Sequence, residues 1–233
     1  MPNKKYPSVV FKERIKSIRE ELENYCNETV DLYRKATSLF EKYDQKKADE
    51  VIERSKEMDI YGYEIERSCI RFIAVEQPLA TDLLYVESSI RVMSHIKRIA
   101  YLCRNMAEAS NEIKDITIPE QLQSDVQFMI DYVQIMLTKG FRAFVNQDIT
   151  IARELSNDDD KVDDLFDSIL KQITQLVAKK EDFALGVINL LFLTRYLERI
   201  GDRVVQIGDR IVFINTNRRP RIEQLKEENW LFL

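Results

Sequence analysis

Apolar residues recur at spacings of three and four along most of the chain, which is the pattern of amphipathic helices packed on near-parallel neighbours. The clearest run comprises Leu190, Leu193, Leu197, Ile200, Val204, Ile207 and Ile211. A second run comprises Val92, Ile96, Ile99, Cys103 and Met106. The strict two-residue alternation of a half-buried strand is missing. The pattern therefore predicts an all-α protein.

Short polar or proline-containing segments interrupt this periodicity, and they divide the chain into long periodic stretches. We predict six long helices, with the ranges 8–42, 46–76, 79–112, 119–146, 149–179 and 182–216. Only 5 Gly and 5 Pro occur among the 233 residues, and so little turn-forming material favours long helices.

The two halves of the chain can be aligned as a repeat. Three positions recur at one constant offset, with Asp44, Ala48 and Asp59 opposite Asp148, Ala152 and Asp163. After a shorter turn in the second half, IKRIAYL at 96–102 stands opposite LERIGDR at 197–203. The repeat predicts two tandem three-helix bundles, residues 1–115 and 116–217, followed by a tail, 218–233.

Two of the predicted helices each carry a pair of acidic residues spaced four apart. Glu198 and Asp202 lie in LERIGDR, and Asp159 and Asp163 lie in the preceding helix. Such neighbours on a helix repel each other. Relative to the apolar run, Glu198 and Asp202 face away from the nearest partner helix, so we expect a surface cluster and not a buried catalytic dyad. Four converging carboxylates would suit a divalent or trivalent ion such as iron, manganese or magnesium better than zinc.

A purely structural interpretation of the same acids stays open. Arg195 and Arg199 precede Glu198 and Asp202 by three residues, a spacing that allows salt bridges on a solvated helix face. The segment 157–160 could also serve as an N-cap and acidic first turn. In that case the acids only stabilise helices.

Composition excludes several other functions. The formal net charge of −5 argues against a broad nucleic-acid or anionic-membrane surface. Cys26, Cys69 and Cys103 are odd in number and far apart, so we expect free, buried thiols in a reducing compartment. The longest apolar run, at 187–193, is too short to cross a bilayer, and no signal peptide is evident. We therefore expect a soluble, cytoplasmic protein without direct membrane insertion.

The sequence also lacks the usual signs of an enzyme. His95 is the only histidine, which removes the Glu-x-x-His pattern of ferritin-like di-iron enzymes, and we expect it at the surface or at its boundary. No Gly-rich phosphate loop, Ser-His-Asp arrangement or nucleophile elbow occurs. We expect a protein without catalytic activity.

Two segments resemble signatures of the PhoU family, and the resemblance extends along nearly the whole chain. AVEQPLATDLL at 74–84 is similar to the family's R-Q-P-x-A-x-D-L-R turn, although Glu76 and Leu84 replace its two arginines. TRYLERIGDRVVQI at 194–207 is similar to the L-E-R-I-G-D signature. The resemblance implies a metal-holding acidic cluster in each bundle, and in the second bundle its residues are Asp159, Asp163, Glu198 and Asp202.

The first bundle departs from that family pattern. Asp59 is kept, but Ser55, Lys97 and Tyr101 stand opposite Asp159, Glu198 and Asp202. An ammonium and a phenol at these positions remove two anionic ligands, so we expect little metal binding there.

The resemblance also implies a function. It predicts a non-enzymatic cytoplasmic regulator that couples the ATPase of a phosphate ABC transporter to a sensor histidine kinase and damps the phosphate-starvation response. Two alternatives stay open, an accessory regulator of another phosphate transporter and a di-metal carboxylate enzyme. The resemblance and the apolar residues 230–233 further predict a homodimer.

Overall fold

The computed structural model describes residues 9–177 and 184–218. These residues form six helices and no strand, and the helices are α1 (Val9–Glu41), α2 (Gln45–Glu76), α3 (Thr81–Ile113), α4 (Glu120–Asn146), α5 (Ile149–Val177) and α6 (Ala184–Thr216). The all-α prediction is confirmed, with boundaries that agree closely. The predicted end at 179 and start at 182 lie outside the described residues.

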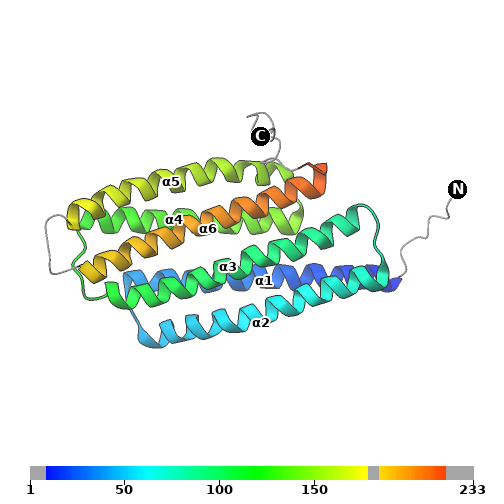
Figure 1. Cartoon of the computed structure of the whole chain (residues 1–233), viewed down its shortest axis with the longest axis horizontal. Coiled ribbons are helices and arrows are strands. Elements are labelled where there is room, and N and C mark those ends of the chain that lie inside the picture. The colour runs from blue at the N-terminus through cyan, green and yellow to red at the C-terminus, as the bar shows by residue number, and fades with distance from the viewer. Residues whose placement is uncertain (1–8, 178–183, 219–233) are drawn as a thin grey trace, which may run out of the picture.

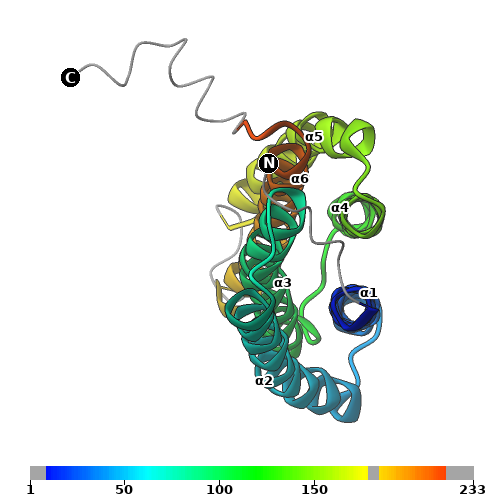
Figure 2. The ribbon, with the colours of Figure 1, turned by 90° about the vertical axis from the view of Figure 1, so that its right-hand side faces the viewer.

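The helices run side by side along the long axis of the molecule (Figure 1). Helices α1 to α3 form one bundle and α4 to α6 form the other, as predicted. Figure 2 shows α2, α3, α6 and α5 following one another in a curved layer, with α1 and α4 on one side of it. Among the described helices, α3 and α6 make the most extensive contact, so these two helices form the main junction between the bundles. The exact division between residues 115 and 116 stays a prediction.

Residues aligned by the sequence repeat have the same structural roles. The Asp44 side chain accepts a hydrogen bond of 2.9 Å from Lys47 N and caps the start of α2. In the second bundle, the Asp148 side chain accepts bonds from Thr150 N and Ile151 N at the start of α5. An acceptor at this position satisfies amides that the helix leaves unpaired. Helices α2 and α5 therefore begin at equivalent points of the repeat, so the residues along the two helices occupy equivalent positions.

The apolar runs found in the sequence form the core. Every residue of the α6 run from Leu190 to Ile211 is fully buried, as are the members of the α3 run. The buried Tyr33 hydroxyl donates a hydrogen bond of 2.8 Å to Ile130 O, which ties α1 to α4 across the bundles. A buried hydroxyl needs such a partner, so this bond also selects the relative position of the two helices.

Two further expectations concern the cysteines and the membrane. All three cysteines are buried and free, as predicted. Among the described helices, none combines the length and the apolar character that a membrane span requires. The terminal apolar residues 230–233 lie outside the described part of the chain.

The connection between α2 and α3 has an unusual backbone conformation. Gln77 and Ala80 both have a φ of 47°, in the left-handed region that residues with a Cβ rarely occupy. Pro78 between them is buried, whereas Leu79 is 81% exposed. The turn that resembles the family's first signature is therefore tight and presents a leucine to solvent.

Candidate metal centre

The two acidic pairs come together because α5 packs directly against α6. Asp159 and Asp163 lie on one helix, and Glu198 and Asp202 lie on the other. Gly201 lies between the two acids of α6, and a Cβ there would be 2.7 Å from Asp159 Oδ1. The Asp159 carboxylate thus rests against the α6 backbone at a position that has no side chain. The predicted convergence of the pairs therefore has a specific cause in the packing.

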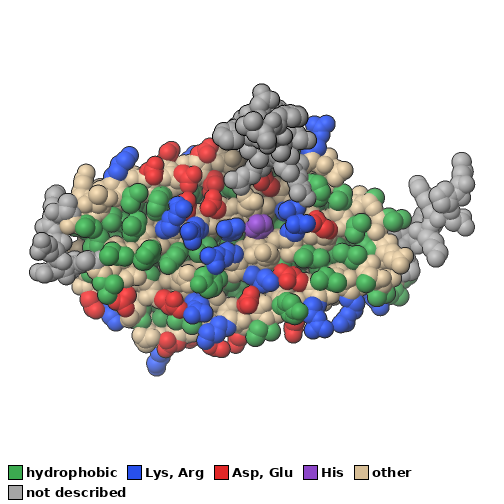
Figure 3. All heavy atoms as spheres, viewed as in Figure 1, with side chains coloured by type: hydrophobic (Ala, Val, Ile, Leu, Met, Phe, Trp, Pro, Cys, Tyr) green, Lys and Arg blue, Asp and Glu red, His purple; other side chains and the backbone are tan. Residues whose placement is uncertain are grey.

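The cluster spans the boundary between the interior and the solvent. Glu198 is only 9% exposed, Asp159 is half-buried, and Asp163 and Asp202 are exposed. The expected surface position holds for Asp202, whereas Glu198 is buried even though it does not belong to the apolar run. Two inner carboxylates and two outer carboxylates result. Figure 3 shows the acidic side chains over α5 lying beside basic side chains over α6.

The acids influence each other electrostatically. Burial, followed by the charges of Asp163, Asp202 and Glu198, raises the pKa of Asp159 to about 7. Burial raises the pKa of Asp163 as well, and the charge of Asp202 adds to that effect. The pKa of Glu198 is also raised, mainly by burial, although Arg195 opposes the change. All three shifts disfavour the charged carboxylates, which is the condition that a bound cation would reverse.

Two oxygen atoms of the cluster have no hydrogen-bond partner although they are buried. They are Asp159 Oδ1 and Glu198 Oε2. The other Glu198 oxygen accepts a bond of 2.5 Å from Arg195 Nη1, and the Arg195 guanidinium also lies over the ring of Phe166. An unpaired buried acceptor costs about 1–3 kcal/mol. The donor set of four carboxylates with two unpaired buried oxygens therefore fits a cation.

The side-chain arrangement is nevertheless not that of a loaded site. No group of three or more His, Cys, Asp or Glu side chains among the described residues is placed to hold a metal ion. Arg195 holds Glu198 Oε1, so only the other oxygen, Oε2, could bind an ion without a change of partner. The four acids are close enough that their charges raise the pKa values of Asp159 and Asp163. Their side chains would have to adopt other rotamers before three or more of them could bind the same ion.

The structural interpretation of the acids explains only part of the cluster. The Arg195–Glu198 salt bridge is present, but within the described ranges no ion pair joins Arg199 to Asp202. Residues 157–160 lie in the interior of α5, which starts at Ile149, so the N-cap interpretation is wrong. Asp158 alone has a clear structural partner set, because Tyr132 Oη and Lys139 Nζ donate to it. Of the four carboxylates in the cluster, Glu198 therefore has a salt bridge, and the described residues show none for the other three.

The equivalent place in the first bundle is built differently. The Ser55 hydroxyl donates a bond of 2.9 Å to Ala100 O, and Ala100 is the counterpart of Gly201. In the first bundle Ser55 thus lies against Ala100, whereas in the second bundle Asp159 lies against Gly201. Lys97 Nζ lies 2.9 Å from Glu66 Oε1, and the stem of Lys97 passes over Gly62. The Lys97 side chain therefore forms an ion pair at the place where the second bundle has Glu198.

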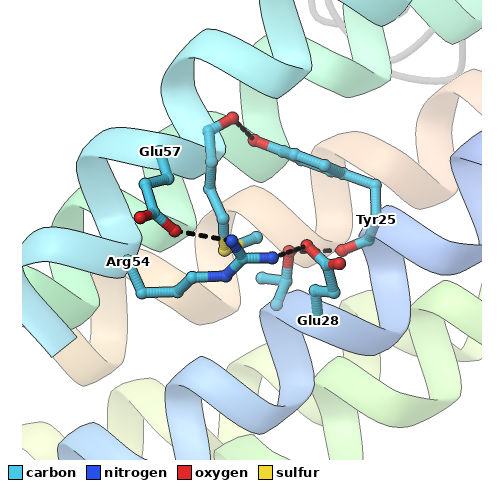
Figure 4. A network of polar contacts seen from close by, with 6 residues as sticks. Tyr25, Glu28, Arg54 and Glu57 are labelled. Carbon is cyan, nitrogen blue, oxygen red and sulfur yellow. Dashed lines mark hydrogen bonds and ion pairs between the residues drawn. The ribbon is translucent and has the colours of Figure 1, made fainter. Parts of the chain in front are cut away.

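Other acids of the first bundle also have built-in cationic partners. Arg54 forms ion pairs of 2.7 Å with Glu28 and 2.6 Å with Glu57 (Figure 4). Beside them, the Tyr25 hydroxyl donates to Met58 O at 2.7 Å and joins α1 to α2. Among the described residues, the buried carboxylate oxygens without a hydrogen-bond partner therefore lie in the second bundle.

Sequence reasoning overlooked Gly201. Its role could have been noticed, because a glycine between two acids of a packed helix allows another backbone or side chain to approach closely. The pairing of Lys97 with Glu66 was not visible, since these residues are far apart in sequence.

The fold and the acidic cluster define a tandem six-helix protein with a candidate cation site in one bundle. A family model described as the PhoU domain matches the chain twice, at residues 22–110 and 126–211. The chain belongs to the PhoU family.

Curated relatives agree with this assignment. The "Phosphate-specific transport system accessory protein PhoU homolog 1" of Methanothermobacter thermautotrophicus is 43% identical over 217 residues, covering 93% of this chain and 99% of the relative. A PhoU homolog of Aquifex aeolicus with the same accessory-protein name is 25% identical, covering 94% of this chain and 98% of the relative. Both relatives are named as accessory proteins, and neither name describes an enzyme.

Solved structures show the same fold. PhoU from Pseudomonas aeruginosa aligns with a TM-score of 0.84 at 21% identity, covering 89% of this chain and all of that protein. The phosphate transport system regulatory protein PhoU from Streptococcus pneumoniae aligns with a TM-score of 0.83 at 20% identity, covering 90% of this chain and 98% of that protein. The tandem bundle is therefore the fold of the family.

Proposed function

We propose that this protein is a non-enzymatic, cytoplasmic regulator of phosphate uptake. The observation that carries the proposal is the 43% identity, over almost the full length of both chains, to a relative named as a phosphate-specific transport system accessory protein. A regulator of this kind acts by binding other proteins. The paired bundles offer two long helical surfaces for this purpose.

The finer part of the proposal concerns the partners. We infer that the protein couples the ATPase of a phosphate ABC transporter to a sensor histidine kinase. The support is the resemblance of the α2–α3 turn and of the LERIGD segment to the family signatures. The exposed Leu79 in that turn provides an apolar contact point, while Glu76 is held by Arg14 at 2.6 Å and so is less available to a partner.

A cation at the cluster of Asp159, Asp163, Glu198 and Asp202 is a further part of this proposal. Supporting observations are the raised pKa values, the two unpaired buried oxygens and the fact that only one of the four carboxylates forms a salt bridge within the described residues. An iron, manganese or magnesium ion would supply positive charge, and the carboxylates would hold it from two helices. The acids would thereby link α5 to α6.

We also propose that the protein forms a homodimer. An exposed apolar stripe on α6, formed by Leu185, Ile188 and Phe192, supports self-association. Light scattering at micromolar concentration should give the mass of two chains, whereas a monomer mass alone would argue against the dimer.

Deletion of the gene in its host tests the regulatory function. In medium rich in phosphate, the deletion strain should take up phosphate without normal restraint and should express a phosphate-starvation reporter, and the wild-type gene should reverse both effects. Deleting the phosphate ABC transporter as well should remove the excess uptake. Unchanged uptake and reporter activity in the first strain would contradict the proposal. Excess uptake that persists in the double deletion would point to another phosphate transporter.

A further inference from the structure

A stripe of hydrogen-bond donors lies along the junction of the two bundles, separate from the acidic cluster. On α6 its members are Arg199, Arg203, Gln206 and Arg210, and on α3 they are Arg91, His95 and Arg98. Spacings of three and four place each set on one face of its helix. Figure 3 shows basic side chains gathered across the middle of this face, over α3 and α6.

The arginines of this stripe differ in the groups that contact them. Arg91 is paired with Glu87, and the guanidinium of Arg98 lies 4.6 Å from the centre of the Tyr101 ring. Arg203 has no ion pair within the described residues. Its Nε is buried and has no hydrogen-bond partner. A buried guanidinium donor without an acceptor is unfavourable, so this position is suited to an acceptor from outside the protein.

His95 lies where the cations of α6 meet α3. It is half-buried, and its pKa is lowered to about 4, first by burial and then by the charges of Arg203 and Arg210. Both guanidinium groups are therefore near enough to act on the imidazole. At neutral pH the ring is uncharged and offers one N–H donor. Two cations on α6 thus act on a neutral donor on α3, the helix that packs against α6.

We propose that Arg203, Arg210 and His95 form a binding site for a small tetrahedral oxyanion with the chemistry of phosphate. Guanidinium groups donate two parallel N–H bonds to such an anion, and this geometry suits phosphate better than chloride. The anion would contact α3 of one bundle and α6 of the other. It would thereby strengthen the junction on which the arrangement of the bundles depends.

This site is independent of the candidate metal centre. Asp202 and Arg203 are adjacent in sequence, but consecutive residues point about 100° apart around a helix. The metal centre attracts cations through acids shared by α5 and α6, whereas the oxyanion site uses donors shared by α3 and α6. An experiment can therefore disprove binding at one site without disproving binding at the other.

His95 provides a direct test because it is the only histidine in the chain. The full-length protein is freed of metal with a chelator, and the pKa of His95 is measured by NMR in chloride and in phosphate at equal ionic strength. A bound dianion stabilises the imidazolium, so millimolar phosphate should raise the pKa of His95 by about one pH unit. An equal pKa in the two salts would overturn the proposal.

Two variants make the test specific. In Arg203→Gln the pKa of His95 should be higher before any phosphate is added, and phosphate should no longer change it. Arg71→Gln removes an exposed arginine on α2 and should behave like the wild type. A full phosphate response in Arg203→Gln would contradict the proposal. If circular dichroism shows that this variant is unfolded, Arg203→Lys should fold and show a weaker response.

A comparison of two ligands identifies the source of the anion. If orthophosphate and glycerol phosphate both raise the pKa of His95, the site accepts the free ion and its esters. A response to glycerol phosphate alone would assign the site to the phosphate group of a larger molecule. Both results support an oxyanion site, and a response to neither would exclude it.

Discussion

At the scale of single residues, the acidic cluster depends on the contact between Asp159 and Gly201. The missing side chain at Gly201 lets the Asp159 carboxylate reach the α6 backbone, where it loses water and lies in the field of Glu198. Without a cation, the negative charge at this position is destabilising. The counterpart contact of Ser55 with Ala100 O carries no charge. The two bundles therefore differ at both positions of this contact, with an aspartate against glycine in one and a serine against alanine in the other.

The raised pKa of Asp159 predicts a specific dependence of stability on pH. Because the folded pKa of about 7 exceeds the unfolded value of 3.8, the folded state holds the proton more tightly, and the metal-free protein loses stability as pH rises between these values. Asp159→Asn should weaken this loss and should be more stable above neutral pH by about 1 kcal/mol, a figure reduced for solvent screening. Urea unfolding across this pH range measures the effect.

The matched control is Asp164→Asn, which changes an exposed acid on the same helix. It should leave the wild-type pH profile unchanged. If Asp159→Asn and the wild type lose stability equally between the two pKa values, Asp159 does not carry the proposed charge penalty.

Lys97 and Glu66 provide the second prediction at this scale. Both side chains are largely buried, with exposures of 21% and 17%. Lys97→Gln should cost about 1–2 kcal/mol, because the Glu66 charge then lacks a partner in a poorly solvated position. Adding Glu66→Gln should recover part of this cost. A double-mutant cycle by urea unfolding gives the coupling energy.

An exposed ion pair serves as the reference for that cycle. Lys16 and Glu20 on α1 are 76% and 60% exposed. Their coupling should be below about 0.5 kcal/mol. Additive effects at Lys97 and Glu66 would show that the lysine is not an internal cation for the first bundle.

At the scale of elements, the turn between α2 and α3 combines backbone strain with an exposed leucine. Ala80 has a φ of 47° and a ψ of −118°, a region that glycine occupies far more readily than alanine. The buried Pro78 and the hydrogen bond from Leu84 N to Ala80 O hold the chain in this conformation. Such strain persists only when the neighbouring helices determine the course of the chain.

Ala80→Gly should therefore stabilise the protein. Relief of the positive φ should exceed the entropy that glycine adds to the unfolded chain and should give a net gain of about 0.5–1 kcal/mol. Ala74→Gly, at an exposed helical position six residues earlier, should instead destabilise by up to about 1 kcal/mol. Thermal unfolding of the two variants compares them directly. A loss of stability in Ala80→Gly would mean that the turn is not strained at this residue.

At the scale of the whole molecule, the two bundles share a fold but differ in chemistry. They meet at α3 and α6, and Tyr33 joins them again through Ile130 O. The first bundle pairs its acids with Lys97 and Arg54, whereas the second leaves carboxylate oxygens unpaired. A cation would therefore act on one bundle only, and the other supplies an internal control.

The sequence predicted the helices well because their signal is local. Spacings of three and four and the scarcity of glycine and proline determine where a helix starts and ends, and Asp44 and Asp148 mark two starts directly. The burial of Glu198 could not be predicted in this way. It depends on which neighbour covers that side of α6, and the apolar run identifies only the closest contact. The pairing of Lys97 with Glu66 likewise depends on the packing of α2 against α3.

Metal content and thermal stability of the purified protein test the central claim, that Asp159, Asp163, Glu198 and Asp202 form a cation site. We expect the wild type to retain a divalent or trivalent ion and to unfold at higher temperature as free metal increases, because the ion binds the folded state. Glu198→Gln/Asp202→Asn should lose both properties, while Asp164→Asn/Asp167→Asn, exposed acids of α5, should keep them. The account would be contradicted if the wild type and Glu198→Gln/Asp202→Asn had equal metal content. It would also be contradicted if added metal did not change the unfolding temperature of the wild type.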